Sequence, residues 1–96
     1  DAIATPELHL HCAEGEHYSL IARLQKEAKF PGAERIIDID GLRVEYRDGF
    51  GLMRASNTTP LIVLRFEADD AAALARIQAQ FRSVLLSAKP DAQLPY

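Results

Sequence analysis

An Asp-Gly pair between two strand-like segments constrains the fold of this chain more than any other feature. In residues 42–47 the apolar residues Leu42, Val44 and Tyr46 alternate with charged ones, which is the pattern of a half-buried β-strand. Residues 34–39 form the strand-like segment on the other side of Asp40-Gly41. Asp-Gly favours a type I′ turn, which needs positive φ at both central residues. A β-hairpin is therefore predicted here.

Three further segments are predicted to be strands. Residues 7–12 alternate strictly, and residues 61–66 are almost continuously apolar, as in a central strand that is covered on at least one face. A short strand is expected at 52–55, after a second turn at Asp48-Gly49. The apolar face of 7–12 holds Leu8, Leu10 and Cys12, and its polar face holds Glu7, His9 and His11.

Two segments have helical periodicity. The first covers residues 17–29 and is ended by Pro31-Gly32. The second is capped by Asp69 or Asp70, and Pro90 stops it. Its buried stripe is predicted to contain Leu74, Ile77, Phe81, Val84 and Leu85. The order β-α-β-β-β-β-α predicts an α+β two-layer domain, with a small antiparallel sheet of four to five strands and two helices on one face.

Length and charge restrict the class of protein. A chain of 96 residues is long enough for one domain with one core. A net charge of −3 offers no general attraction to nucleic acid or to acidic membranes, and no apolar run approaches the roughly 20 residues that span a bilayer. The single cysteine, Cys12, cannot form an internal disulfide. We therefore expect a cytoplasmic chain without nucleic-acid or membrane partners. We also expect it to be a monomer.

The ends of the chain differ from its middle. Residues 1–6 resemble a linker that enters a domain and are predicted to be an interdomain hinge. Residues 7–90 form the predicted domain, and residues 91–96 a tail that extends over the surface. Because the chain opens without methionine, it is treated as a possible segment of a longer protein.

The segment from Arg54 to Thr59 is the strongest candidate for a binding site. It contains one guanidinium, three hydroxyls (Ser56, Thr58 and Thr59) and the amide of Asn57, with no carboxylate among them. An arginine can hold two phosphate oxygens at once, and successive backbone N–H groups in a turn can bind an anion. Composition alone favours a plain polar connection whose side chains satisfy the turn, with anion binding as the alternative.

Two other groups of residues could be considered as metal ligands, but their arrangement is less favourable. Glu7, His9 and His11 share a strand face, but such a flat arrangement rarely surrounds a metal ion. Asp38 and Asp40 flank a tight turn and are interpreted as turn and surface residues, with a metal role as the minor alternative.

Three more residues need an interpretation. His17 lies at a helix start and is expected to be structural. Cys12 is expected in the core, since nothing in the sequence would lower its pKa. Arg65 either supports the 54–59 segment or pairs with an acidic neighbour.

Three runs resemble a known family: Asp40-Gly-Leu-Arg-Val-Glu-Tyr46, Gly51-Leu-Met-Arg-Ala-Ser-Asn-Thr-Thr-Pro60 and Leu64-Arg-Phe-Glu-Ala68. They are similar to the C-terminal domain of the α-D-phosphohexomutases, and most of all to the bacterial bifunctional phosphomannomutase/phosphoglucomutase branch. Many members carry Arg-x-Ser-Gly-Thr-Glu-Pro in this loop, where this chain has Asn57 and Thr59 in place of the Gly and the Glu. Thr5-Pro6-Glu7, Arg76-Ile77-Gln78 and Leu94-Pro95-Tyr96 fit as well.

The resemblance implies a TATA-binding-protein-like fold and a role as the fourth domain of an enzyme. Such enzymes interconvert hexose 1-phosphates and 6-phosphates of mannose and glucose through a bisphosphorylated intermediate, with a phosphoserine in the first domain and Mg²⁺ in the second. The fourth domain holds the phosphate that is not reacting and rotates to close the cleft. Arg54, Ser56, Asn57 and Thr58 would make this contact, with Thr59 a less certain neighbour.

Several expectations follow from this resemblance. The partners would be glucose 1-phosphate, mannose 1-phosphate, their 6-phosphates and bisphosphates, and the other domains of the same enzyme. The segment alone would hold no catalytic residue and no metal ion, and would be inactive. The alternative is a free-standing interaction module whose sheet face binds a protein without phosphate specificity. Such a module has no need to assemble the Arg54 to Thr59 segment.

Overall fold

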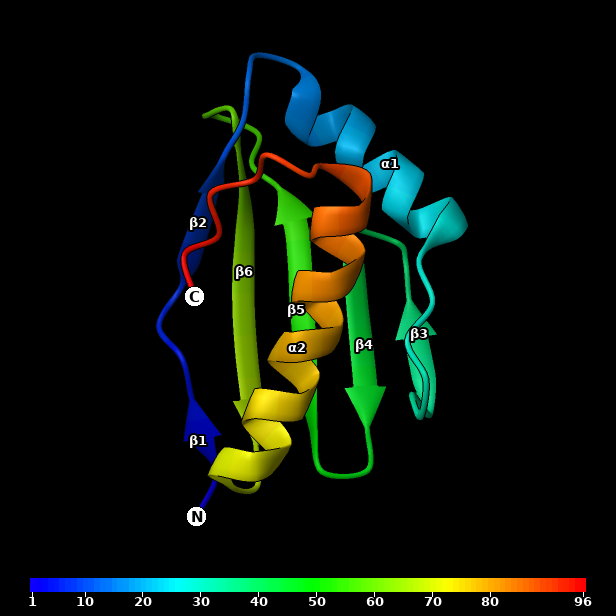
Figure 1. Ribbon diagram of the computed structural model, residues 1–96, viewed down its shortest axis with the longest axis vertical. Helices are drawn as coiled ribbons and strands as arrows, with labels where there is room; N and C mark the ends of the chain where they lie inside the picture. The colour runs from blue at the N-terminus through cyan, green and yellow to red at the C-terminus, as the bar shows by residue number, and fades with distance from the viewer.

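The computed structural model describes all 96 residues of the chain. It contains one antiparallel sheet with two helices packed on the same face (Figure 1). The helices are α1 (Glu16–Glu27) and α2 (Ala71–Ala88). Neither is long and apolar enough to cross a membrane. The strands are β1 (Ile3–Ala4), β2 (Leu8–His11), β3 (Arg35–Ile37), β4 (Leu42–Tyr46), β5 (Gly49–Ala55) and β6 (Leu61–Ala68).

The sheet has the order β1-β6-β5-β4-β3, and β2 also pairs with β6. β1 lies beside Glu67 and Ala68, and β2 lies beside the first half of the same strand. The six strands therefore occupy five positions, and the predicted α+β fold with both helices on one face is confirmed. β1 falls within residues 1–6, so part of the expected linker is hydrogen-bonded to the domain. The role of this segment as a hinge stays a prediction.

The two layers enclose a core of 17 buried residues. α2 packs over β5 and β6, while α1 packs against α2 and β5. Gly51 allows α2 to approach the sheet closely, because a Cβ atom at this position would lie 2.4 Å from the ring of Phe81. Phe81 is itself fully buried and meets Phe66 edge to face, with ring centroids 5.1 Å apart.

The β3–β4 hairpin is confirmed, but the predicted type I′ turn is wrong. β3 ends at Ile37, and residues 38–41 form a wider loop in which Gly41 has a φ of 71° and Asp40 has no positive φ. Gln25 of α1 explains the difference, because its amide donates hydrogen bonds to the carbonyls of Asp38 (3.1 Å) and Gly41 (2.9 Å). A tertiary contact therefore overrides the local turn preference.

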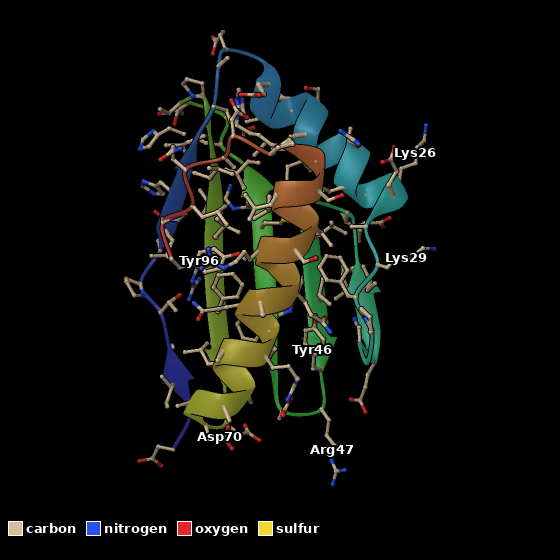
Figure 2. All side chains as sticks on the ribbon, in the orientation of Figure 1. Lys26, Lys29, Tyr46, Arg47, Asp70 and Tyr96 are labelled. Atoms are coloured by element: carbon tan, nitrogen blue, oxygen red, sulfur yellow. The ribbon has the colours of Figure 1, made fainter.

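The remaining elements follow the prediction with shifted ends. Asp70 caps α2, accepting a hydrogen bond from the Ala73 N–H. β5 begins at Gly49 instead of Leu52, and pairs Gly49 with Tyr46 across a tight turn. The tail has no regular structure but packs against the core, with Tyr96 lying over β6 and its ring centroid 5.1 Å from that of Phe66 (Figure 2).

Candidate functional site

Residues 56–60 form the loop that joins β5 to β6, at the end of the sheet where α1 begins (Figure 1). The base of this loop is closed by two backbone hydrogen bonds, from Ser56 N–H to the Leu61 carbonyl (2.9 Å) and from Leu61 N–H to the Thr59 carbonyl (2.7 Å). Cys12 N–H, just after β2, donates to the Pro60 carbonyl (2.9 Å). The base is thus fixed on two sides, while Asn57, Thr58 and Thr59 are exposed.

Ser56 organises the exposed part of the loop. Its Oγ accepts hydrogen bonds from the backbone N–H groups of Thr58 (3.2 Å) and Thr59 (3.3 Å). It also lies 3.3 Å from the Thr58 hydroxyl. Two successive amides therefore converge on one oxygen, an arrangement that suits an anion. No peptide carbonyl takes either amide.

Arg54 is the cation next to this loop. It lies on β5 opposite Val63, and strand alternation places it on the sheet face away from the helices, because its neighbour Met53 is fully buried beneath them. Arg54 as a whole residue is half-buried, and its guanidinium makes no hydrogen bond or ion pair within the chain. A fixed positive charge without a carboxylate partner can bind an anionic ligand at this end of the sheet.

Arg65 lies on the same open face as Arg54. It is exposed on β6 opposite Leu52, one diagonal step from Arg54, which corresponds to a Cα separation of about 7–8 Å. None of the seven ion pairs of the chain involves Arg65. Of the two alternatives left open by the sequence, pairing with an acidic neighbour is therefore not seen.

The other candidate clusters do not form a metal site. His9 pairs with Glu7 (Nε2 to Oε2, 3.1 Å), and the His9 and His11 rings are 6.4 Å apart. Asp38 and Asp40 lie in the 38–41 loop. No group of three or more His, Cys, Asp or Glu side chains is placed to hold a metal ion.

Cys12 and His17 lie close to the loop but on the helix side. Cys12 packs against the core, and burial raises the pKa of its thiol, as does the nearby Glu16 carboxylate. A thiol of this kind is a poor nucleophile at neutral pH. His17 is only 3% exposed and lines a cavity of about 90 Å³ together with Asn57, Thr58 and Thr59. The sequence does not reveal this neighbourhood, because His17 and Asn57 are 40 positions apart in the chain.

Larger hollows lie elsewhere on the surface. One of about 300 Å³ lies between α1 and α2, and another of about 430 Å³ lies over Arg43 and Phe50. Neither contains a residue of the 56–60 loop. Charge and loop geometry, rather than cavity size, mark the candidate site.

The chain is a small α+β domain whose sheet is covered on one face by two helices. A polar loop and an unpaired arginine lie at one end of this sheet. Residues 7–84 match the model of the family "Phosphoglucomutase/phosphomannomutase, C-terminal domain". The chain belongs to this family, which confirms the resemblance seen in the sequence.

Individual relatives agree with this assignment. A phosphoglucomutase of Neisseria meningitidis is 59% identical over 90% of the chain, and a phosphomannomutase/phosphoglucomutase of Pseudomonas putida is 48% identical over 98% of it. The crystal structure of a phosphoglucomutase/phosphomannomutase family protein from Burkholderia thailandensis matches the whole chain with a TM-score of 0.89 and 57% identity. The chain spans about a fifth of the length of these relatives: 19%, 20% and 20% respectively.

Proposed function

We propose that this chain is the phosphate-holding domain of an enzyme that reversibly interconverts the 1-phosphates and 6-phosphates of glucose and mannose through a bisphosphorylated intermediate. Arg54, Ser56, Asn57 and Thr58 contact the phosphate that is not reacting, and Thr59 lies beside them. The observation that carries the proposal is the unpaired Arg54 guanidinium beside a loop whose Thr58 and Thr59 amides converge. The names of the relatives support the same reaction.

Holding the phosphate that does not react, at a distance from the reacting centre, has a physical reason. Contacts to a phosphate far from the reacting centre supply binding energy that orients the sugar. Each charge-assisted hydrogen bond contributes about 1.5–3 kcal/mol. A site that recognises only a phosphate dianion accepts either end of the sugar, which a reversible mutase requires. Rotation of the domain over the cleft would exclude water that otherwise hydrolyses a phosphoenzyme.

The remaining chemistry is assigned to other parts of the full-length enzyme. The described residues include no side-chain group suited to Mg²⁺. In the proposal the metal ion, the phosphoserine and the groups that recognise the sugar ring belong to the four-fifths of the enzyme outside this chain. The chain alone is then a binding domain without catalytic activity.

An NMR titration of the 96-residue chain with glucose 1-phosphate tests the proposal. Its core of 17 buried residues, drawn from both layers, supports independent folding. This domain alone makes only part of the contacts to the substrate. A binding free energy of about 4 kcal/mol from these contacts corresponds to a dissociation constant near 1 mM. We expect the amide signals of residues 55–59 to move and the others to stay, with no response to glucose. Uniform or absent shifts at about 10 mM ligand would contradict the proposal.

A further inference from the structure

His17 is the exception in an otherwise apolar core. The other buried side chains are hydrophobic, and the hydroxyl of Tyr46 donates to Gln80 (2.5 Å). The Nδ1 atom of His17, by contrast, is buried and has no hydrogen-bond partner, and the hydroxyl of Tyr96 in the tail is the other such atom. A buried polar atom without a partner is costly and calls for an explanation.

The position of His17 suggests what this nitrogen is for. The residue lies in the first turn of α1, on the inward stripe that continues with Leu20 and Ile21. His17 lines the cavity of about 90 Å³ together with Asn57, Thr58 and Thr59 of the loop. His17 therefore backs the loop from the helix layer, whereas Arg54 lies on the opposite face of the sheet.

The loop residues that line this cavity with His17 carry polar groups. Asn57, Thr58 and Thr59 are exposed, and the Thr58 and Thr59 amides make only long bonds (3.2 and 3.3 Å) to the Ser56 hydroxyl. A phosphate dianion competes with that hydroxyl, because charge-assisted bonds are the stronger ones. Drawing the amides toward phosphate moves the loop, and the cavity leaves room for the movement.

We propose that His17 is a positioning residue for phosphate binding: when the loop engages phosphate, a polar group of residues 57–59 pairs with His17 Nδ1 and holds the loop in its binding shape. This inference rests on the proposed function. His17 does not itself touch the phosphate. Burying a nitrogen without a partner costs free energy, and the new hydrogen bond offsets this cost only when the loop has bound phosphate. The pairing therefore increases the affinity for phosphate and not the stability of the free chain.

Three substitutions separate this role from simple packing. His17→Phe keeps an aromatic ring and removes both nitrogens, His17→Asn places an amide near the position of Nδ1, and His17→Gln places one near Nε2. We expect His17→Phe to unfold at the same or higher urea concentration than the parent chain, but to bind glucose 1-phosphate about three- to tenfold more weakly. His17→Asn should recover most of the affinity and His17→Gln little of it. His9→Gln, which removes an exposed imidazole, should change neither property.

The same titration provides a spectroscopic readout. In the parent chain the ¹⁵N signal of His17 Nδ1 should shift on addition of glucose 1-phosphate, as expected for a nitrogen that gains a hydrogen bond. A constant signal would overturn the inference, as would equal affinity of the parent and a folded His17→Phe chain. Equal weakening by His17→Phe and His17→Asn would also overturn it. If the parent chain itself does not respond to phosphate, the proposed function fails and the inference fails with it.

Discussion

At the scale of single residues, the arginines divide into two groups. Arg76 forms two hydrogen bonds with the Asp48 carboxylate (2.5 and 3.0 Å), and Arg43 bonds to Glu45 (2.9 Å) while stacking 3.9 Å from the centre of the Phe50 ring. These arginines tie the fold together. Arg54 has no such partner, so its charge is available to a ligand.

Replacing Arg54 tests this difference in the full-length enzyme. In the proposed site, Arg54→Ala would remove the guanidinium that pairs with the phosphate dianion. We expect kcat/KM to fall roughly 30- to 1,000-fold, which corresponds to a loss of about 2–4 kcal/mol of transition-state stabilisation. Arg54→Lys should also be impaired, because a point charge cannot make two parallel bonds. Steady-state kinetics with glucose 1-phosphate provide the measurement.

Arg47 offers a matched control for this experiment. It also makes no ion pair, but it points away from the fold at the β4–β5 turn, far from the 56–60 loop (Figure 2). Arg47→Ala should leave the kinetics unchanged. Equal losses in the Arg47 and Arg54 variants, or no loss in either, would argue against a phosphate contact at Arg54.

At the scale of elements, the loop between β3 and β4 shows how a turn depends on its surroundings. Gly41 combines a positive φ of 71° with a close approach to β5, where a Cβ atom would lie 2.2 Å from the Met53 carbonyl oxygen. Gly32 has a similar φ of 85° but open space around it. Substituting each glycine by alanine therefore distinguishes the cost of backbone strain alone, at Gly32, from the cost of strain and steric clash together, at Gly41.

We expect Gly41→Ala to destabilise the chain by about 3 kcal/mol or more, because strain and clash add. Gly32→Ala carries only the strain, about 1–2 kcal/mol. Urea unfolding followed by circular dichroism measures both. Equal losses at the two positions would mean that the approach of Gly41 to β5 is not a constraint.

The start of α2 gives a second prediction at this scale. The Asp70 side chain accepts a hydrogen bond from the Ala73 N–H (2.8 Å), whereas Asp69 makes only a backbone bond, to the Asp48 carbonyl. Asp70→Ala should lower the free energy of unfolding by about 0.5–2 kcal/mol. Asp69→Ala should change it little, and the reverse order in thermal or urea unfolding would show that the cap is misassigned.

At the scale of the whole molecule, ion pairs join parts that are distant in the sequence. Arg76 of α2 bonds to Asp48 at the β4–β5 turn, and Lys89 after α2 bonds to Glu16 at the start of α1 (3.0 Å). The hydrogen bond from Arg76 lowers the pKa of Asp48. A bond from the Ala13 N–H, followed by one from Lys89, lowers the pKa of Glu16.

Stability should therefore fall in acid. A carboxyl group whose pKa is lower in the folded chain stabilises the fold above its unfolded pKa, near 3.8 for Asp48 and 4.5 for Glu16, and this contribution is lost as pH falls through the folded value. Urea unfolding at neutral pH and near pH 3 measures the loss. Asp48→Asn should show a smaller acid dependence than the parent, and an equal dependence of the two chains would contradict this role of the Arg76 bond.

Much of the architecture could be predicted because it depends on local periodicity. The alternation around Val44 and the helical stripe through Ile77 and Phe81 each place side chains on one face whatever the rest of the chain does. The candidate loop was also visible, since its residue types stand together between two strands. The pairing of Ile3 and Ala4 with β6 was missed, because a two-residue strand has no period to detect.

An α+β domain with helices on one face of the sheet, and the polar segment from Arg54 to Thr59, follow from the order of residue types alone, since periodicity and composition are properties of neighbouring residues. Which distant residues meet depends on the folded arrangement of the strands and helices. It brought Gln25 to the 38–41 loop, left Arg54 without a carboxylate partner, and placed His17, with its buried Nδ1, in the lining of one cavity with residues 57–59. Such contacts depend on strand register and layer packing, which no short stretch of sequence encodes.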